Sequence, residues 1–238
     1  MLSLAGINTY YGYSHVLHDV SLEVRKGEIV VLLGRNGVGK TTTIKTVMGI
    51  QPPRTGTVLF CGETISGLPP HKIARRGISL IPEDRRVLPN LTVYENLKLG
   101  SLIQGRNGQR EAMFETVFNY FPRLKERLKQ EGGKLSGGEQ QMLTIARGLM
   151  AKPKLMLIDE PTEGLAPKFV HEIMGIIQKL QQDGVTILLV DQHVEMAMRL
   201  SRNLRAYVME KGEIRMCGTL AELDARRDEV VRCLGVKI

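Results

Sequence analysis

Residues 28–42 read Glu-Ile-Val-Val-Leu-Leu-Gly-Arg-Asn-Gly-Val-Gly-Lys-Thr-Thr, an apolar run that passes directly into a glycine-rich turn. The apolar residues 29–33 are typical of a buried strand, and a helix is expected after the turn. The turn fits the pattern G-x-x-x-x-G-K-[ST], in which successive backbone N–H groups surround phosphate groups at the start of a helix. This stretch therefore predicts a phosphate-binding loop in an α/β fold.

The loop also predicts which side chains contact a nucleotide. We expect Lys40 to meet the β- and γ-phosphate oxygens and Thr41 to coordinate Mg²⁺. A chance glycine-rich turn is the alternative, and the strand and helix on either side of the loop disfavour it. The residues expected to bind ATP from this segment are Gly34, Arg35, Asn36, Gly37, Val38, Gly39, Lys40, Thr41 and Thr42.

A second apolar run, residues 155–158, ends in the adjacent carboxylates Asp159 and Glu160. In an enzyme with a phosphate-binding loop, an aspartate at this position belongs on the metal ion, and a neighbouring glutamate orients or deprotonates the attacking water. We therefore assign Asp159 to Mg²⁺ and Glu160 to the water. The alternative is a strand end that is merely polar, and the upstream loop makes it the weaker interpretation.

The segment Leu135-Ser136-Gly137-Gly138-Glu139 opens a helical stretch. Its small residues leave backbone N–H groups and the serine hydroxyl free at a helix N-terminus, which favours a second anion site. A generic N-cap would explain Ser136 alone. Two glycines in a row would cost helix stability if the segment only capped the helix.

The periodicity of the chain changes twice along its length. Strands are expected at 2–10, 17–24, 28–33, 56–60 and 78–81, and a helical insert is expected over about 92–151 with a break at Pro122. Strands at 155–158 and 185–190 then alternate with helices at 167–182 and 194–201, followed by a hairpin at Lys211-Gly212. This order predicts a single unit, 1–238, with a mostly parallel sheet covered by helices on both faces.

Composition restricts the function further. The formal charge of +8, from 33 Lys and Arg against 25 Asp and Glu, suits a polyanionic ligand such as ATP, a nucleic acid or an anionic membrane face. No apolar run reaches the roughly 18 residues of a membrane-spanning helix, and residues 1–6 do not resemble a secretory signal, so a cytoplasmic protein is expected. Three cysteines, Cys61, Cys217 and Cys233, have neither disulfide nor zinc spacing and are interpreted as reduced thiols.

Residues 135–139 resemble the signature sequence of ABC-type ATPases, and their place between the phosphate-binding loop and Asp159-Glu160 matches the order in that family. The resemblance covers nearly the whole chain. It implies a P-loop core with an antiparallel β subdomain and an inserted helical subdomain. It also implies that the signature of one subunit completes the ATP site of a second subunit, in a head-to-tail homo- or heterodimer.

Three further positions are carried over by the resemblance. Tyr11 resembles the aromatic residue that stacks on adenine, with Tyr10 and Tyr13 as alternatives. Where most members carry a glutamine that senses the γ-phosphate, this chain has Glu83, which retains a carboxylate for Mg²⁺.

Most members also carry a switch histidine after the strand at 186–190. This chain places Gln192 there and His193 one residue later. A role for Gln192 or His193 at the phosphates is expected, and an exposed position for His193 at a helix start is the alternative.

Residues 82–86 (Pro-Glu-Asp-Arg-Arg), 91–97 and 160–167 resemble the LivF-type subunit of branched-chain amino acid importers. Urea and amide importer ATPases share much of this pattern. The resemblance implies membrane permease subunits, a second ATPase subunit and, indirectly, a solute-binding protein as partners, at the cytoplasmic face of the membrane. The permease is expected to dock near residues 83–96, and no nucleic acid is expected.

Two alternatives from other classes are a soluble ABC ATPase that acts on nucleic acid or ribosomes and an ATPase of a cofactor-assembly machine. The former usually has two ATPase units or a long coiled coil, and this chain has one copy of each motif and no long heptad run.

Overall fold

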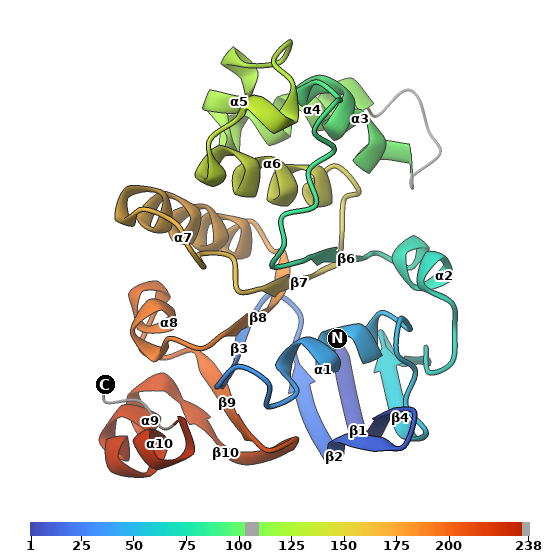
Figure 1. Ribbon diagram of the computed structural model, residues 1–238, viewed down its shortest axis with the longest axis vertical. Helices are drawn as coiled ribbons and strands as arrows, with labels where there is room; N and C mark the ends of the chain where they lie inside the picture. The colour runs from blue at the N-terminus through green and yellow to red at the C-terminus, as the bar shows by residue number, and fades with distance from the viewer. Residues whose placement is uncertain (103–109, 235–238) are drawn as a thin grey trace.

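The computed structural model describes residues 1–102 and 110–234. Its central element is a sheet whose neighbouring strands are parallel except at one edge, where β10 pairs antiparallel with β9 (Figure 1). In spatial order the strands are β10 (Glu213–Thr219), β9 (Arg205–Glu210), β3 (Ile29–Gly34), β8 (Thr186–Asp191), β7 (Leu155–Asp159) and β6 (Ile78–Ile81).

Both faces of this sheet are buried, and alternate residues of β3 show which layer covers each face. Val31 and Leu33 pack in one core with the helices α6 (Gly137–Leu149), α7 (Pro167–Gln182) and α8 (Val194–Leu200). Val30 and Leu32 point the other way, into a core shared with α1 (Lys40–Val47). Side chains alternate across a strand, so a strand covered on both faces reads as a continuous apolar run.

An antiparallel sheet completes the second core. Its strands, in spatial order, are β2 (Ser14–Val24), β1 (Leu2–Tyr11), β4 (Thr55–Phe60) and β5 (Glu63–Thr64). Leu4, Ile7 and Phe60 of this sheet are buried against the same residues as α1. The helix that follows the phosphate-binding loop is therefore held between the two sheets. The short helix α2 (Pro70–Arg75) leads from the antiparallel sheet to β6.

Helices form one end of the molecule, on the far side of α7 from the antiparallel sheet (Figure 1). Phe114, Phe121 and Leu143 belong to its core, which is continuous with the helical face of the main sheet. The elements of this helical part are α3 (Val93–Ser101), α4 (Arg110–Tyr120), α5 (Pro122–Glu126), a 3-10 turn at Gly132–Lys134, and α6. After β10 the chain continues into α9 (Leu220–Ala225) and α10 (Arg227–Leu234).

The observed bounds agree with the expected elements to within a few residues, and β6 and α7 match them completely. The expected break at Pro122 is confirmed, because α4 ends at Tyr120 and Pro122 begins a separate helix, α5. Proline lacks an N–H group, and the first residue of a helix has no partner for that group, so proline is well placed there. Residues 103–109 of the expected insert lie outside the described residues. Within the described ranges, no helix has the length and apolar character needed to cross a membrane.

Asn96 organises the loop that enters the helical part. Its side chain is fully buried, its Oδ1 accepts from the N–H of Leu88 at 3.1 Å, and its Nδ2 donates to the carbonyl oxygens of Leu88 and Leu91 at 3.1 Å. The guanidinium of Arg147 in α6 donates to the same Oδ1 at 3.3 Å. The loop therefore depends on one amide side chain for backbone hydrogen bonds that a sheet or helix would otherwise supply.

We predict that Asn96→Ala lowers the free energy of unfolding by about 2–4 kcal/mol, because several buried backbone groups lose their partners together. Denaturant unfolding measures the change. The exposed Asn90, six residues earlier, provides the control Asn90→Ala, which should lie within about 0.5 kcal/mol of the wild type. Equal effects of the two substitutions would contradict the assignment.

Candidate functional site

The phosphate-binding loop runs from the end of β3 to the start of α1, and two of its glycines are needed for its shape. A Cβ on Gly34 would lie 2.7 Å from Val38 Cγ2 and 2.8 Å from the carbonyl oxygen of Met209, so no side chain fits there. Gly39 has φ 114° as the N-cap of α1, in the left-handed region that other residues rarely adopt. The loop is therefore tightly wound, with the N-terminus of α1 at its end.

The ammonium group of Lys40 is buried at the end of this loop. Its side chain is only 3% exposed, and Nζ donates to the carbonyl oxygen of Arg35 at 2.9 Å. Nζ also lies 3.1 Å from Glu160 Oε1, and the Glu160 side chain is 7% exposed. The residue expected at the phosphates, Lys40, and the residue expected at the water, Glu160, are thus brought together as a buried ion pair.

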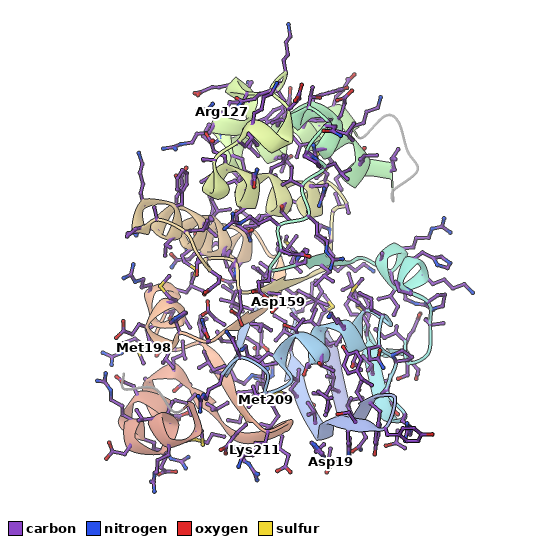
Figure 2. The ribbon with its side chains drawn as sticks, viewed as in Figure 1. Asp19, Arg127, Asp159, Met198, Met209 and Lys211 are labelled. Carbon is purple, nitrogen blue, oxygen red and sulfur yellow. The ribbon has the colours of Figure 1, made fainter. Side chains whose placement is uncertain are left out.

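Asp159 lies at the carboxyl end of β7, near the middle of the molecule (Figure 2). Burial raises the pKa of its carboxyl group to about 6; a hydrogen bond from Thr41 opposes this shift, and the negative charges of Glu160 and Glu83 add to it. Its Oδ1 is buried without a hydrogen-bond partner. The expected metal-binding residues Thr41, Asp159 and Glu83 are therefore neighbours, and one carboxylate oxygen among them is unsatisfied.

This group of residues is chemically suited to Mg²⁺. Among the described residues, no cluster of three or more His, Cys, Asp or Glu is placed to hold a metal ion alone. Mg²⁺ usually binds one or two carboxylates and completes its coordination with phosphate oxygens and water. A hydroxyl, an unpaired carboxylate and an adjacent phosphate-binding loop fit that requirement.

The backbone at Glu160 is held in a sparsely populated conformation, with φ 41°. Its N–H donates to the carbonyl oxygen of Val190 at 2.9 Å, which ties the turn after β7 to β8. Left-handed backbone at a residue other than glycine is characteristic of sites where the surrounding structure fixes a functional side chain. The position of the Glu160 carboxylate is therefore determined by the sheet.

The segment after β8 places Gln192 and His193 differently from each other. Gln192 Nε2 donates to Glu163 Oε2 at 3.2 Å, within the turn that follows Glu160. His193 is the N-cap residue of α8 and is 55% exposed, with its Nδ1 3.3 Å from Asp191 Oδ1. The position of His193 agrees with the alternative of an exposed residue at a helix start.

The three candidate adenine-binding tyrosines also differ. Tyr10 is stacked on His15, with ring centroids 4.1 Å apart. The guanidinium carbon of Arg54 lies 3.8 Å from the centroid of the Tyr10 ring. Tyr11 is 43% exposed and Tyr13 is fully exposed. Since Tyr10 already uses its ring within the sheet, Tyr11 and Tyr13 are the rings that a ligand can reach.

The segment 135–139 starts α6 in the helical part. Ser136 is the N-cap, with its Oγ accepting from the N–H of Glu139, and Glu139 bonds back to the N–H of Ser136. A Cβ on Gly138 would lie 2.2 Å from the ring of Phe169 in α7, so the second glycine allows α6 and α7 to approach closely. In the described part of the chain, no hydrogen bond or ion pair joins this segment to Lys40 or Asp159.

Sequence reasoning missed two residues at the site. Asp191 at the end of β8 is 2% exposed, its Oδ2 is without a hydrogen-bond partner, and burial raises its pKa. The sequence contained a signal for Asp191, because an apolar strand ends in an aspartate at both Asp159 and Asp191.

Arg85, the second missed residue, has φ 58° and donates to the carbonyl oxygen of Glu163 at 3.3 Å. It also lies against Gly137, and no sequence pattern indicated this contact.

Comparisons with known proteins agree with this arrangement. The family model described as "ABC transporter" matches residues 17–163. The chain is 48% identical to the high-affinity branched-chain amino acid transport ATP-binding protein BraG of Pseudomonas aeruginosa, over 94% of each chain. It is 36% identical, over 99% of each chain, to the Archaeoglobus fulgidus protein named "Probable branched-chain amino acid transport ATP-binding protein LivF".

A relative with a different transport role is also similar. The lipopolysaccharide export system ATP-binding protein LptB of Escherichia coli is 38% identical, over 94% of this chain and 93% of LptB. Among solved structures, a nucleotide-free ATP-binding cassette from an ABC transporter has a TM-score of 0.85 and 27% identity, over 100% of this chain and 99% of that one.

The pKa of Asp159 leads to a prediction about stability and pH. Its carboxyl group titrates near 6 in the folded protein and near 3.8 when unperturbed. The folded state therefore holds more protons between these values, so this group's contribution to stability falls as the pH rises from about 4 to 6. Asp159→Asn should remove that fall and make the nucleotide-free protein more stable at pH 7 by on the order of 1–3 kcal/mol.

Thermal unfolding of the wild type and Asp159→Asn at pH 4.5, 6 and 7.5 measures this difference. The control is Asp84→Asn, at an exposed aspartate whose side chain is 61% accessible. A stability difference between Asp159→Asn and the wild type that stays constant over this pH range would rule out the raised pKa.

Proposed function

The chain belongs to the ABC transporter family of ATPases, and from this premise we propose that it drives a membrane permease that imports branched-chain amino acids. The observation that carries the ATPase site is the buried contact of Lys40 with Glu160 beside Asp159, at the carboxyl ends of parallel strands. The observation that favours the substrate is 48% identity to BraG, against 38% to the exporter protein LptB.

We assign nucleotide binding to the loop residues 34–42. Their backbone N–H groups and the start of α1 would surround the phosphates, and the ring of Tyr11 would stack on adenine. Thr41, Asp159 and Glu83 would hold Mg²⁺, which when bound neutralises charge on the phosphate oxygens. The Lys40 ammonium, now shared between Arg35 and Glu160, would turn to the β- and γ-phosphate oxygens.

Hydrolysis transfers the γ-phosphoryl group to water. Oxygen of the water forms the new bond to the γ-phosphorus as the bond to the bridging oxygen breaks, leaving ADP and inorganic phosphate. Glu160 would orient this water and accept its proton. Because the phosphates compete for Lys40, nucleotide binding would release the Glu160 carboxylate for this role. Gln192 donates to Glu163, and the N–H of His193 donates to Asp191. Through these contacts, loss of the γ-phosphate would change the position of the turn after Glu160.

The second half of each site would come from another ATPase subunit. We propose that residues 135–139 of that subunit face the phosphates in a head-to-tail dimer, which fits their separation from Lys40 and Asp159 within one chain. Whether the second subunit is another copy of this chain or a related chain is decided by the experiment on Glu160 below.

The permease would dock on the helical part. A cavity of about 530 Å³ is lined by Glu83, residues 84–87, Pro89, Gly133, Gln140 and Glu163, so it reaches from the proposed γ-phosphate sensor to α6. Leu88, between the lining residues Val87 and Pro89, is 41% exposed. A short amphipathic helix at the cytoplasmic face of the permease suits an apolar rim with a charged floor. We therefore propose that the chain works at the cytoplasmic face of the membrane, with a solute-binding protein on the other side.

Import of urea or short amides is the second candidate, because transported solute does not reach this subunit and the two groups share motifs. Branched-chain amino acids are preferred on the identity to BraG. Uptake assays with leucine and urea, in cells that carry or lack this chain, separate the two. If cells that lack this chain lost urea uptake and kept leucine uptake, urea would replace branched-chain amino acids as the proposed substrate.

We predict that Glu160→Gln retains ATP and forms a stable closed dimer, because the neutral amide cannot accept the proton from water and no longer pairs with Lys40. Hydrolysis should fall at least 100-fold, consistent with loss of a general base. Size-exclusion mass with and without ATP and Mg²⁺ measures the closure. A shift to twice the monomer mass identifies self-pairing, and retention of ATP at monomer mass identifies a different ATPase subunit as the partner.

We predict that Leu88→Glu uncouples hydrolysis from transport, because a charge at the rim of the docking cavity disfavours an apolar partner surface. Uptake should fall at least tenfold, while ATP affinity and the unfolding midpoint stay within error. Leu102→Glu, at another exposed leucine outside the lining of this cavity, is the matched control. Unimpaired uptake by Leu88→Glu would contradict the proposed docking surface.

A further inference from the structure

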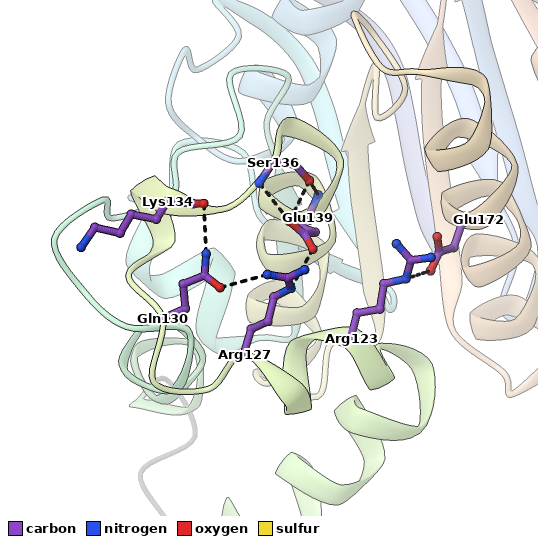
Figure 3. A network of polar contacts seen from close by, with 7 residues as sticks. All are labelled: Arg123, Arg127, Gln130, Lys134, Ser136, Glu139 and Glu172. Atoms are coloured by element: carbon purple, nitrogen blue, oxygen red, sulfur yellow. Dashed lines mark hydrogen bonds and ion pairs between the residues drawn. The ribbon is translucent and has the colours of Figure 1, made fainter.

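The signature serine is held by a chain of polar contacts that extends well beyond the signature itself (Figure 3). Ser136 Oγ donates to Glu139 Oε2 at 2.8 Å, and the N–H of Ser136 donates to the same oxygen at 2.9 Å. The other oxygen, Oε1, is 2.8 Å from the Nε of Arg127. One carboxylate therefore connects the serine to an arginine in the segment after α5.

Arg127 is itself fixed on its other side. Its Nη1 donates to Gln130 Oε1 at 3.1 Å, and Gln130 Nε2 donates to the carbonyl oxygen of Lys134 at 3.0 Å. Lys134 lies two residues before Ser136 in the chain. The contacts therefore form a closed ring with the residues that lead into α6, and Figure 3 shows Arg127 between Gln130 and Glu139.

Both oxygens of the Glu139 carboxylate have partners within the same chain. Its side chain is 8% exposed, and burial raises its pKa, but the hydrogen bonds from Ser136 and the positive charge of Arg127 outweigh this, so its pKa lies below the usual value. An ionised Glu139 is an acceptor only, so the hydroxyl proton of Ser136 points at it. Ser136 Oγ also accepts from the N–H of Glu139 at 3.4 Å.

We propose that Arg127 is a positioning residue for the signature: through Glu139 it fixes Ser136 and the first turn of α6, whose backbone N–H groups would serve the ATP site of the partner subunit. This inference rests on the proposed function, since Ser136 matters only if residues 135–139 complete a nucleotide site. Glu139 then contributes through Ser136, and its carboxylate does not itself contact the nucleotide. The charged, forked guanidinium is suited to this, because it holds Glu139 and Gln130 at once in fixed directions.

A double-mutant cycle of steady-state ATP hydrolysis tests the proposal, using the wild type, Arg127→Ala, Ser136→Ala and the double variant. We expect Arg127→Ala to lower kcat about tenfold and Ser136→Ala to lower it at least as much. The double variant should be no slower than Ser136→Ala, because residues that act through one another are not additive. ATP affinity of the chain should not change, since its own phosphate-binding loop is intact.

Two further variants separate positioning from folding. Lys129→Ala removes one positive charge from an exposed lysine of the same segment and should keep wild-type kcat and unfolding midpoint. Arg127→Lys keeps the charge but loses the fork, so its kcat should lie between Arg127→Ala and the wild type. A lowered unfolding midpoint in Arg127→Ala with kcat restored on cooling would assign Arg127 to folding alone.

The outcomes distinguish the two levels of the proposal. Losses that multiply in the double variant, or wild-type kcat for Arg127→Ala, would overturn the positioning role and leave the proposed function standing. The assay contains the partner ATPase subunit that the Glu160→Gln experiment identifies, whether a second copy or a related chain. If this complete pair does not hydrolyse ATP, or if Lys40→Ala has no effect on its hydrolysis, the proposed function fails and the inference falls with it.

Discussion

The alignment of three parallel strands governs the chemistry of this molecule. Leu33 pairs with Asp191 and Asp159 pairs with Val190, so β3, β8 and β7 end at one edge of the sheet. That edge brings the Lys40 ammonium next to Glu160 and near Asp159, and the buried carboxylate of Asp191 lies near Glu160. Concentrating negative charge in a buried region costs free energy, and one lysine cannot balance three carboxylates. The raised pKa of Asp159 and the unpaired oxygens of Asp159 and Asp191 are the visible result.

This imbalance explains why the site suits a cationic metal bound to a polyanion. A bound Mg²⁺ would satisfy Asp159, and the phosphates would take the Lys40 ammonium from Glu160. Unbalanced negative charge is therefore concentrated at the proposed nucleotide site. The strained backbone at Glu160 belongs to the same pattern, because the sheet fixes the position of a side chain that a relaxed turn would leave mobile.

The helical part has a different task, which is to present small residues without losing rigidity. Two glycines at the start of α6 would weaken an isolated helix. Here Gly138 allows Phe169 of α7 to pack against the helix, and the Ser136–Glu139 capping box is held from outside by Arg127. The flexibility that the glycines introduce is removed by contacts from neighbouring segments. The first turn of this helix is then held in a fixed position, as the proposed role toward a second subunit requires.

Local patterns in the sequence determined the phosphate-binding loop, the Asp159–Glu160 pair, the signature and most elements, because each depends on a few consecutive residues. Apolar runs predicted β3, β7 and β8, and loop chemistry predicted the start of α1. Only the tertiary structure decided that Glu160 pairs with Lys40 and that Asp191 joins the site. It also decided that the ring of Tyr10 packs against His15 and Arg54, and that Arg127 holds Glu139. These contacts join residues distant in the chain or depend on side-chain burial, and both are set by how the strands and helices pack. Periodicity and motif spacing carry no record of that packing, so the ion pairs and buried charges had to come from the fold.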